Sequence, residues 1–88
     1  MVRAVVLINA GRGMIESTGE AVAAVPGIYE VYSVAGRVDL VAHISVRTNE
    51  DLAEIVSGQL AKIEGVLATE TLIAFRVYSR ADSEAGFS

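Results

Sequence analysis

The sequence has no cysteine and no tryptophan, and it contains a single histidine and a single proline. Without cysteine, the chain can form no disulfide, no thiolate nucleophile and no cysteine-ligated zinc site. A single histidine leaves few candidates for acid–base chemistry. The absence of cysteine fits a cytoplasmic protein, and we predict that location.

Basic residues and long apolar runs are also scarce. The chain has seven lysines and arginines in total, and its formal net charge is −4. Phosphate contacts need clustered basic side chains, so direct binding to nucleic acid is not expected. The run Val5–Ile8 is too short for the core of a signal peptide. No stretch approaches the roughly 20 apolar residues of a membrane span, so no membrane association is expected.

Apolar residues, in contrast, are abundant for a chain of this size. They make up 52% of the 88 residues. A chain of this length forms one domain and buries only about 60–65% of its unfolded surface. Apolar surface in excess of the core is typical of a partner interface. We therefore expect a homo-oligomer.

Apolar spacing and turn signals divide the chain into six elements. Apolar positions at helical spacing favour two helices; Pro26-Gly27 ends the first, and an N-cap at Thr48 or Asn49 begins the second. Runs of β-branched and apolar residues favour strands. The predicted elements are a strand over 2–10, a helix over 14–25, strands over 28–35 and 38–47, a helix from 49 that ends at Gly65, and a strand over 66–78.

This order, β-α-β-β-α-β, is that of the ferredoxin-like plan. It is an α+β fold in which two helices cover one face of a four-stranded antiparallel sheet. We expect one domain over residues 1–79 and a flexible polar tail over residues 80–88.

Alternation along residues 38–47 divides the third strand between the two faces of this sheet. The helix-facing residues are predicted to be Val38, Leu40, Ala42, Ile44 and Val46. The opposite face is predicted to carry Asp39, Val41, His43, Ser45 and Arg47, joined by Val5, Leu7, Leu72, Ala74 and Arg76. This second face is too apolar to be exposed to solvent and too polar to be the buried core of a single chain. A second copy packed against it would give a dimeric α+β barrel.

The hairpin between the two middle strands contains the first candidate site. Gly36 can adopt the positive φ that a tight turn often needs, and Asp39 follows three residues later. A carboxylate there either satisfies the amides of its own turn or holds the ammonium group of a small ligand. The residues alone leave both readings open.

Two segments of the chain carry a family resemblance. The first runs from Val25-Pro26-Gly27-Ile28 through Val31–Gly36 to Asp39. The second is Ile63–Thr71, a Gly-Val pair followed by spaced threonines. Together they resemble the effector-binding (RAM) domain of the leucine-responsive/asparagine regulator family, Lrp/AsnC. The resemblance covers roughly residues 2–78, nearly the whole chain.

The resemblance implies a stand-alone effector-binding domain without the family's helix-turn-helix domain. It further implies dimers assembled into a ring, with a small amino acid bound between dimers near the hairpin turn. It also implies DNA-binding members of the family as partners in a hetero-assembly. Carried over by motif, the ligand-binding residues are Gly36, Arg37, Val38, Asp39, Thr69 and Thr71. Ala35 departs from the family, where a hydroxylated residue is common, which leaves the identity of the amino acid open.

The alternative function is a small dimeric α+β barrel enzyme of the monooxygenase or isomerase type. Such an enzyme needs a polar cluster on the second face, which offers only His43, Arg47, Arg76 and Asp39. We predict a binding module with no catalytic residue, no metal and no cofactor. His43 is interpreted as an interface residue, and Tyr29, Tyr32 and Tyr78 as interface or core aromatics. Glu50, Asp51 and Glu54 are interpreted as a solvated helix start.

Overall fold

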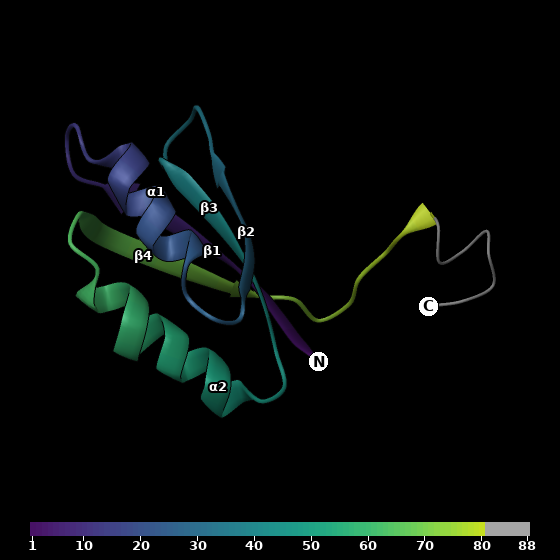
Figure 1. The fold of residues 1–88 in the computed structure, drawn as a ribbon. Coiled ribbons are helices and arrows are strands. Elements are labelled where there is room, and N and C mark those ends of the chain that lie inside the picture. Colours follow the sequence, from purple (N-terminus) through teal and green to yellow (C-terminus); the bar gives the residue numbers. More distant parts are fainter. Residues whose placement is uncertain (81–88) are drawn as a thin grey trace.

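The computed structural model describes residues 1–80, and their elements follow the predicted order (Figure 1). The elements are β1 (Val2–Ala10), α1 (Ile15–Ala23), β2 (Ile28–Ser33), β3 (Leu40–Val46), α2 (Asn49–Ala53) with its continuations η1 (Glu54–Gln59) and η2 (Leu60–Lys62), and β4 (Val66–Ile73). All strand pairs are antiparallel, and the sheet order is β2-β3-β1-β4. The predicted ferredoxin-like fold is confirmed.

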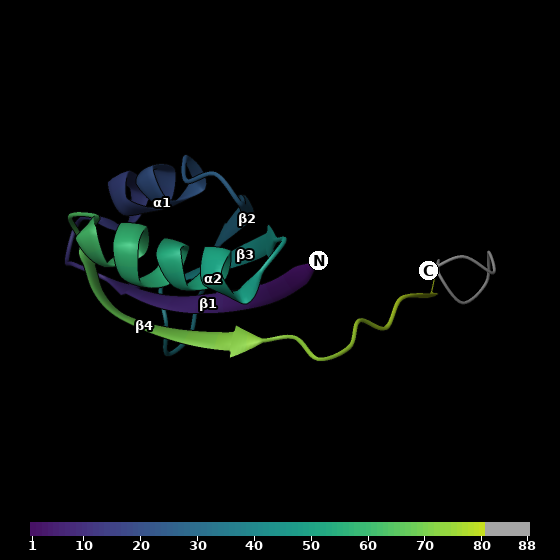
Figure 2. The same cartoon turned by 90° about the horizontal axis from the view of Figure 1, so that it is seen from below.

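Both helices lie on the same side of the sheet, as Figure 2 shows. The core forms between them and the sheet, where β1 contributes Ala4, Val6 and Ile8 and β3 contributes Leu40, Ala42, Ile44 and Val46. The predicted helix-facing residues within β3 are therefore correct. Val38 lies in the preceding loop and is only half-buried. None of the helices in the described part of the chain is long and apolar enough to cross a membrane.

The other side of the sheet has no covering element among residues 1–80, and we call it the open face. Ladder pairing assigns its residues, because partners in register point to the same side. They are Arg3, Val5 and Leu7 of β1, Glu30 and Tyr32 of β2, Val41, His43 and Ser45 of β3, and Glu70 and Leu72 of β4. Leu72 is 47% exposed, and Val5, Leu7 and Val41 are only half-buried.

Helix α1 packs through Thr18 and Val22. The apolar positions that predicted this helix are Ile15, Ala21, Val22 and Val25, and of these only Val22 and Val25 are buried. Ile15 and Ala21 are exposed, whereas Thr18 is 1% exposed. The Thr18 hydroxyl donates to the backbone carbonyl of Glu64 at 3.4 Å, which offsets the cost of burying it. Threonine is polar and is not counted among the apolar positions, so apolar spacing alone does not predict that Thr18 is buried.

The second helix begins as predicted but changes its winding. The Thr48 hydroxyl accepts a hydrogen bond from the Asp51 amide at 3.0 Å, and Glu50 and Asp51 are exposed. The helix then passes through the π-helical turn η1 and ends in the 3₁₀ turn η2. A π turn repeats after about five residues, so Ile55 and Leu60 both stay buried beneath the helix.

Strand β4 ends at Ile73, so the predicted strand over residues 66–78 is too long. The Ala74 amide still donates to the Arg3 carbonyl at 2.8 Å. Because β1 begins at Val2, only that one residue of β1 lies beyond Arg3, and the strand pairing ends there. The chain then leads away from the body of the domain (Figures 1 and 2). Apart from Arg80, the tail predicted over residues 80–88 lies outside the described residues.

Gly65 joins the end of the second helix to β4 at a crowded point. Its φ is +98°, and a Cβ there would collide with the Thr18 hydroxyl oxygen. Its carbonyl also accepts a hydrogen bond from the Gly11 amide at 2.8 Å. Both the backbone conformation and the close approach of α1 require glycine here.

We predict that Gly65→Ala lowers the free energy of unfolding by about 3 kcal/mol, which combines left-handed strain with the displacement of Thr18. Gly13→Ala is the matched control, because Gly13 has φ +74° with nothing within 4 Å of an added Cβ. The control should lose only about 1 kcal/mol in urea unfolding. Equal losses in the two variants would contradict the steric part of the argument.

Candidate functional site

The loop between β2 and β3, residues 34–39, is held to the centre of the sheet by Asp39. The loop is closed by a hydrogen bond from the Val34 amide to the Asp39 carbonyl at 3.0 Å. The Asp39 amide donates to the Ile8 carbonyl at 2.9 Å, and one carboxylate oxygen accepts from the Ala10 amide at 2.8 Å. Asp39 thus precedes β3 and binds the end of β1 rather than the amides of its own turn.

This arrangement leaves part of the Asp39 carboxylate available. The bond from the Ala10 amide uses Oδ2, and no other hydrogen bond to this carboxylate forms within residues 1–80. A carboxylate has about four acceptor positions. Asp39 can therefore hold β1 and accept a further donor at the same time.

A hollow of about 210 Å³ lies where the loop meets β1 and β4. It is lined by Leu7, Asn9, Arg37, Val38, Ala68, Thr69 and Glu70. The Arg37 guanidinium and the Glu70 carboxylate are 3.9 Å apart, and their side chains are 79% and 58% exposed. An ion pair this exposed contributes little to stability, so both charges are available to a ligand.

The structure brings together some of the predicted site residues and separates others. Arg37, Val38 and Thr69 line the hollow, whereas Gly36 and Asp39 belong to the same loop without lining it. Thr71 lines a different hollow between α2 and β4. Thr69 and Thr71 pair with Ile8 and Val6, which are buried beneath the helices. Strand alternation therefore directs both threonine side chains to the helix side of β4.

Asn9 and Glu70 line the hollow and were not identified from the sequence. Both carried a signal: Asn9 is two residues after Leu7, and Glu70 is two residues before Leu72. Leu7 and Leu72 were assigned to the second face, so alternation gives the same face for their polar neighbours. The motif comparison favoured the flanking threonines instead.

A second polar cluster lies on the open face around His43. The rings of Tyr29 and Tyr32 lie 5.9 and 4.9 Å from the His43 ring, centroid to centroid. The Tyr32 hydroxyl donates to the Glu30 carboxylate at 2.8 Å. This hydrogen bond and the negative charge of Glu30 raise the pKa of Tyr32. The tyrosines are 56% and 47% exposed, so neither belongs to the core.

Within residues 1–80, no group of three or more histidine and acidic side chains could hold a metal ion. The hollow offers a cation, an anion and a carboxamide, beside three apolar residues, Leu7, Val38 and Ala68. That combination suits recognition of a small zwitterion.

Comparison with known proteins gives one family for nearly the whole chain. A family model described as the Lrp/AsnC ligand binding domain matches residues 3–83. A helix-turn-helix transcriptional regulator of Pyrococcus horikoshii is 39% identical over 56 residues, which are 64% of this chain and 37% of that protein. The chain thus corresponds to little more than a third of this relative's length.

Solved structures agree with this result. The crystal structure of TTHA0845 from Thermus thermophilus is 44% identical and superposes with a TM-score of 0.85, covering 91% of this chain and all of that one. A transcriptional regulator of Neisseria meningitidis, solved as a complex with L-Met, is 11% identical with a TM-score of 0.80. Its likeness covers 90% of this chain and 53% of that one and concerns the fold alone.

Removing the Asp39 side chain tests its structural role. Asp39→Ala leaves the part-buried Ala10 amide without its acceptor, so we expect the free energy of unfolding to fall by about 1–3 kcal/mol in urea. Asp39→Asn keeps an oxygen at the same position and should lose clearly less. If Asp39→Ala were as stable as the parent, this bond would not hold the loop.

Proposed function

Because the chain belongs to the Lrp/AsnC ligand-binding domain family, we propose that it is a regulatory binding module for a free amino acid. The ligand binds beside the loop of residues 34–39, in the hollow that Arg37 and Glu70 border. The observation that carries the proposal is the pairing of a cation and an anion at the rim of one small hollow.

The charges suit the two ends of an amino acid. The α-carboxylate meets the Arg37 guanidinium and the backbone amides around Gly36. The α-ammonium meets the Glu70 carboxylate in the hollow and, at the adjoining loop, the unused oxygen of Asp39, which does not itself line the hollow. The apolar lining from Leu7 and Val38 receives the ligand's side chain. At about 210 Å³, the hollow is smaller than the roughly 300 Å³ of ordinary ligand pockets, which favours a small ligand.

Water weakens a site of this kind when it is open. Arg37 and Glu70 are mostly exposed in the isolated chain, and ion pairs in water contribute little. The same contacts strengthen severalfold where a neighbouring subunit excludes water. The proposed site is therefore completed at a contact between subunits, as the family resemblance implies.

The open face supports this assembly. Val5, Leu7, Val41 and Leu72 form its apolar part, and no other element of residues 1–80 covers them. We propose that two copies pair through their open faces and that the dimers associate further into a ring. Association with DNA-binding family members would use the same surfaces, because their ligand-binding domains have the same fold.

The enzyme alternative has less support. The matched relative is a transcriptional regulator, and the ring of His43 on the open face packs against those of Tyr29 and Tyr32. We do not expect direct contact with nucleic acid either. The net charge of −4 opposes binding to phosphate.

A melting screen of the twenty amino acids tests the binding proposal. A ligand at 100 times its dissociation constant should stabilise each site by about 2.7 kcal/mol and raise the melting temperature by several degrees. Asp39→Asn should keep the fold, because its oxygen still accepts from Ala10, but should lose most of the shift with its charge. Arg37→Gln and Glu70→Gln should weaken binding as well.

Glu50→Gln is the matched control, because it removes one carboxylate from an exposed position at the start of α2. Its melting temperature should rise with ligand as much as that of the parent. The site assignment is wrong if no amino acid shifts the parent, or if Asp39→Asn responds fully.

Light scattering tests the assembly independently of any ligand. We expect the purified chain to be at least a dimer at micromolar concentration, since burying the apolar part of the open face stabilises the pair. Leu72→Asp places a charge in the apolar part of this face, on β4 beside Val5, and should favour the monomer. A parent that stays a monomer of about 9 kDa at high concentration rules out the proposed pairing.

A further inference from the structure

One polar side chain of the hollow beside residues 34–39 has no hydrogen-bond partner in the described part of the chain. Asn9 lies near the end of β1 and lines this hollow, and its carboxamide forms no hydrogen bond with residues 1–80. A carboxamide has two N–H donors and an oxygen that accepts. Asn9 is half-buried, so water satisfies these groups while the hollow is open. A ligand that displaces this water has to replace its hydrogen bonds.

The sheet places the Asn9 carboxamide beside an unfilled space. Asn9 pairs with Ala68 in the ladder between β1 and β4, and Leu7 pairs with Glu70 two residues earlier. Directly opposite side chains on one face of a sheet have their Cβ atoms about 4.5–5.5 Å apart. Ala68 ends at its Cβ, so the space that a longer side chain would fill above it stays open. Asn9 therefore borders the hollow one pair further along the strands than Glu70.

The charged groups determine which part of a ligand reaches Asn9. In the proposed function, on which this inference rests, Arg37 and Glu70 bind the α-carboxylate and the α-ammonium group of an amino acid. The rest of the lining consists of Leu7, Val38, Ala68, Thr69 and Asn9. Strand pairing directs the Thr69 side chain to the helix side of the sheet. Among residues 1–80, Asn9 is thus the one uncharged polar side chain that the ligand's own side chain meets.

The size of the hollow limits the length of that side chain. The volume is about 210 Å³, below the roughly 300 Å³ of ordinary ligand pockets. The two charged groups of the amino acid and its α-carbon occupy part of this volume. What remains accepts a side chain of a few heavy atoms that ends near the Asn9 carboxamide.

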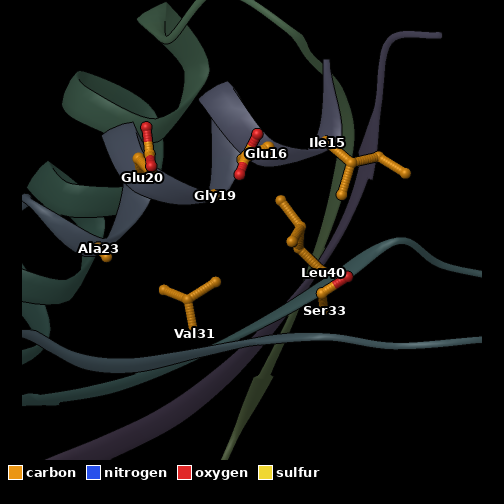
Figure 3. Close-up of a pocket in the computed structure, with 8 residues that line it drawn as sticks. All are labelled: Ile15, Glu16, Gly19, Glu20, Ala23, Val31, Ser33 and Leu40. Atoms are coloured by element: carbon orange, nitrogen blue, oxygen red, sulfur yellow. The ribbon is translucent and has the colours of Figure 1, made fainter. Parts of the chain in front are cut away.

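The larger groove on the helix side does not offer the same chemistry. It lies between α1 and β2 and has a volume of about 470 Å³. Figure 3 shows Glu16 and Glu20 on the helix, with Val31 and Leu40 pointing towards it from the strands. The two carboxylates repel the α-carboxylate of an amino acid, and among residues 1–80 no basic side chain lines this groove. Selection of the amino acid therefore depends on the hollow that Asn9 lines.

We propose that Asn9 selects the ligand, so that the chain binds amino acids with a short, uncharged polar side chain in preference to aliphatic amino acids of the same shape. A ligand hydroxyl accepts from the Asn9 N–H group or donates to its oxygen, and a ligand carboxamide does both. An aliphatic side chain displaces water from Asn9 and returns no hydrogen bond. A site that pairs with a polar group discriminates against the analogue that lacks it.

Two pairs of free amino acids with nearly equal shapes test this selection by titration calorimetry. Threonine differs from valine, and asparagine from leucine, in polar atoms only. The polar member of at least one pair should bind the parent at least about tenfold more tightly than its aliphatic counterpart. Equal or tighter binding of the aliphatic member in both pairs overturns the inference. A parent that binds only charged, aromatic or aliphatic amino acids overturns it as well.

Asn9→Leu tests the residue responsible, because leucine has nearly the shape of asparagine without its polar atoms. The preference for the polar member should fall to about twofold or less, or reverse. Asn9→Ala removes the carboxamide without filling the hollow and should lose the preference too. Asn49→Leu is the matched control, because it makes the same change at an exposed position that does not line the hollow. Its preference should equal that of the parent.

Circular dichroism and thermal melting check that each variant folds. A preference that survives in folded Asn9→Leu and Asn9→Ala contradicts the assignment to Asn9. The outcomes also separate this inference from the proposed function. If no amino acid binds the parent, both fail. If amino acids bind and Arg37→Gln and Glu70→Gln weaken them, but the polar and aliphatic members bind equally, only the selection by Asn9 is wrong.

Discussion

The sheet of this chain is covered on one face only, and the rest of the structure depends on that constraint. Two helices bury Val6, Ile8, Ala42 and Ile44 almost completely. The alternate residues of the same strands, such as Val5 and Val41, have no covering element in the described part of the chain. A strand with apolar residues on both sides is stable only when both sides are buried. The domain therefore has a buried core on the helix side of the sheet and, on the open face, an apolar surface that suits the proposed pairing.

The same constraint determines where a ligand can bind tightly. On the helix side, core residues fill the space beneath the helices, and the groove between α1 and β2 is lined by two carboxylates, Glu16 and Glu20, and, within residues 1–80, by no cation. On the open face, the loop of residues 34–39 and the start of β4 leave a hollow with Arg37 and Glu70 at its rim. Asp39 fixes the position of this loop, because its carboxylate accepts a hydrogen bond from the Ala10 amide at the end of β1. The two roles that the sequence left open for Asp39, binding a backbone amide and binding a ligand, are therefore compatible.

The sequence predicted the order of elements, the buried half of β3 and the N-cap at Thr48, because each depends on local periodicity or on a hydrogen bond within one turn. It could not predict Thr18 in the core, because that burial depends on a carbonyl of Glu64, distant in the chain. It also overextended β4, because the end of a strand is set by the length of its partner. The candidate threonines came from a motif, and only pairing with Val6 and Ile8 reveals their side.

The polar residues of the open face are as important to the proposed pairing as the apolar ones. A purely apolar face would associate in many registers, whereas charges and hydroxyl groups penalise the wrong ones. His43 lies between Tyr29 and Tyr32, and the Tyr32 hydroxyl is held by Glu30. These side chains are ordered by contacts within one chain before a second copy arrives, so little further entropy is lost in placing them. Their fixed positions favour one relative orientation of the two sheets in the proposed dimer.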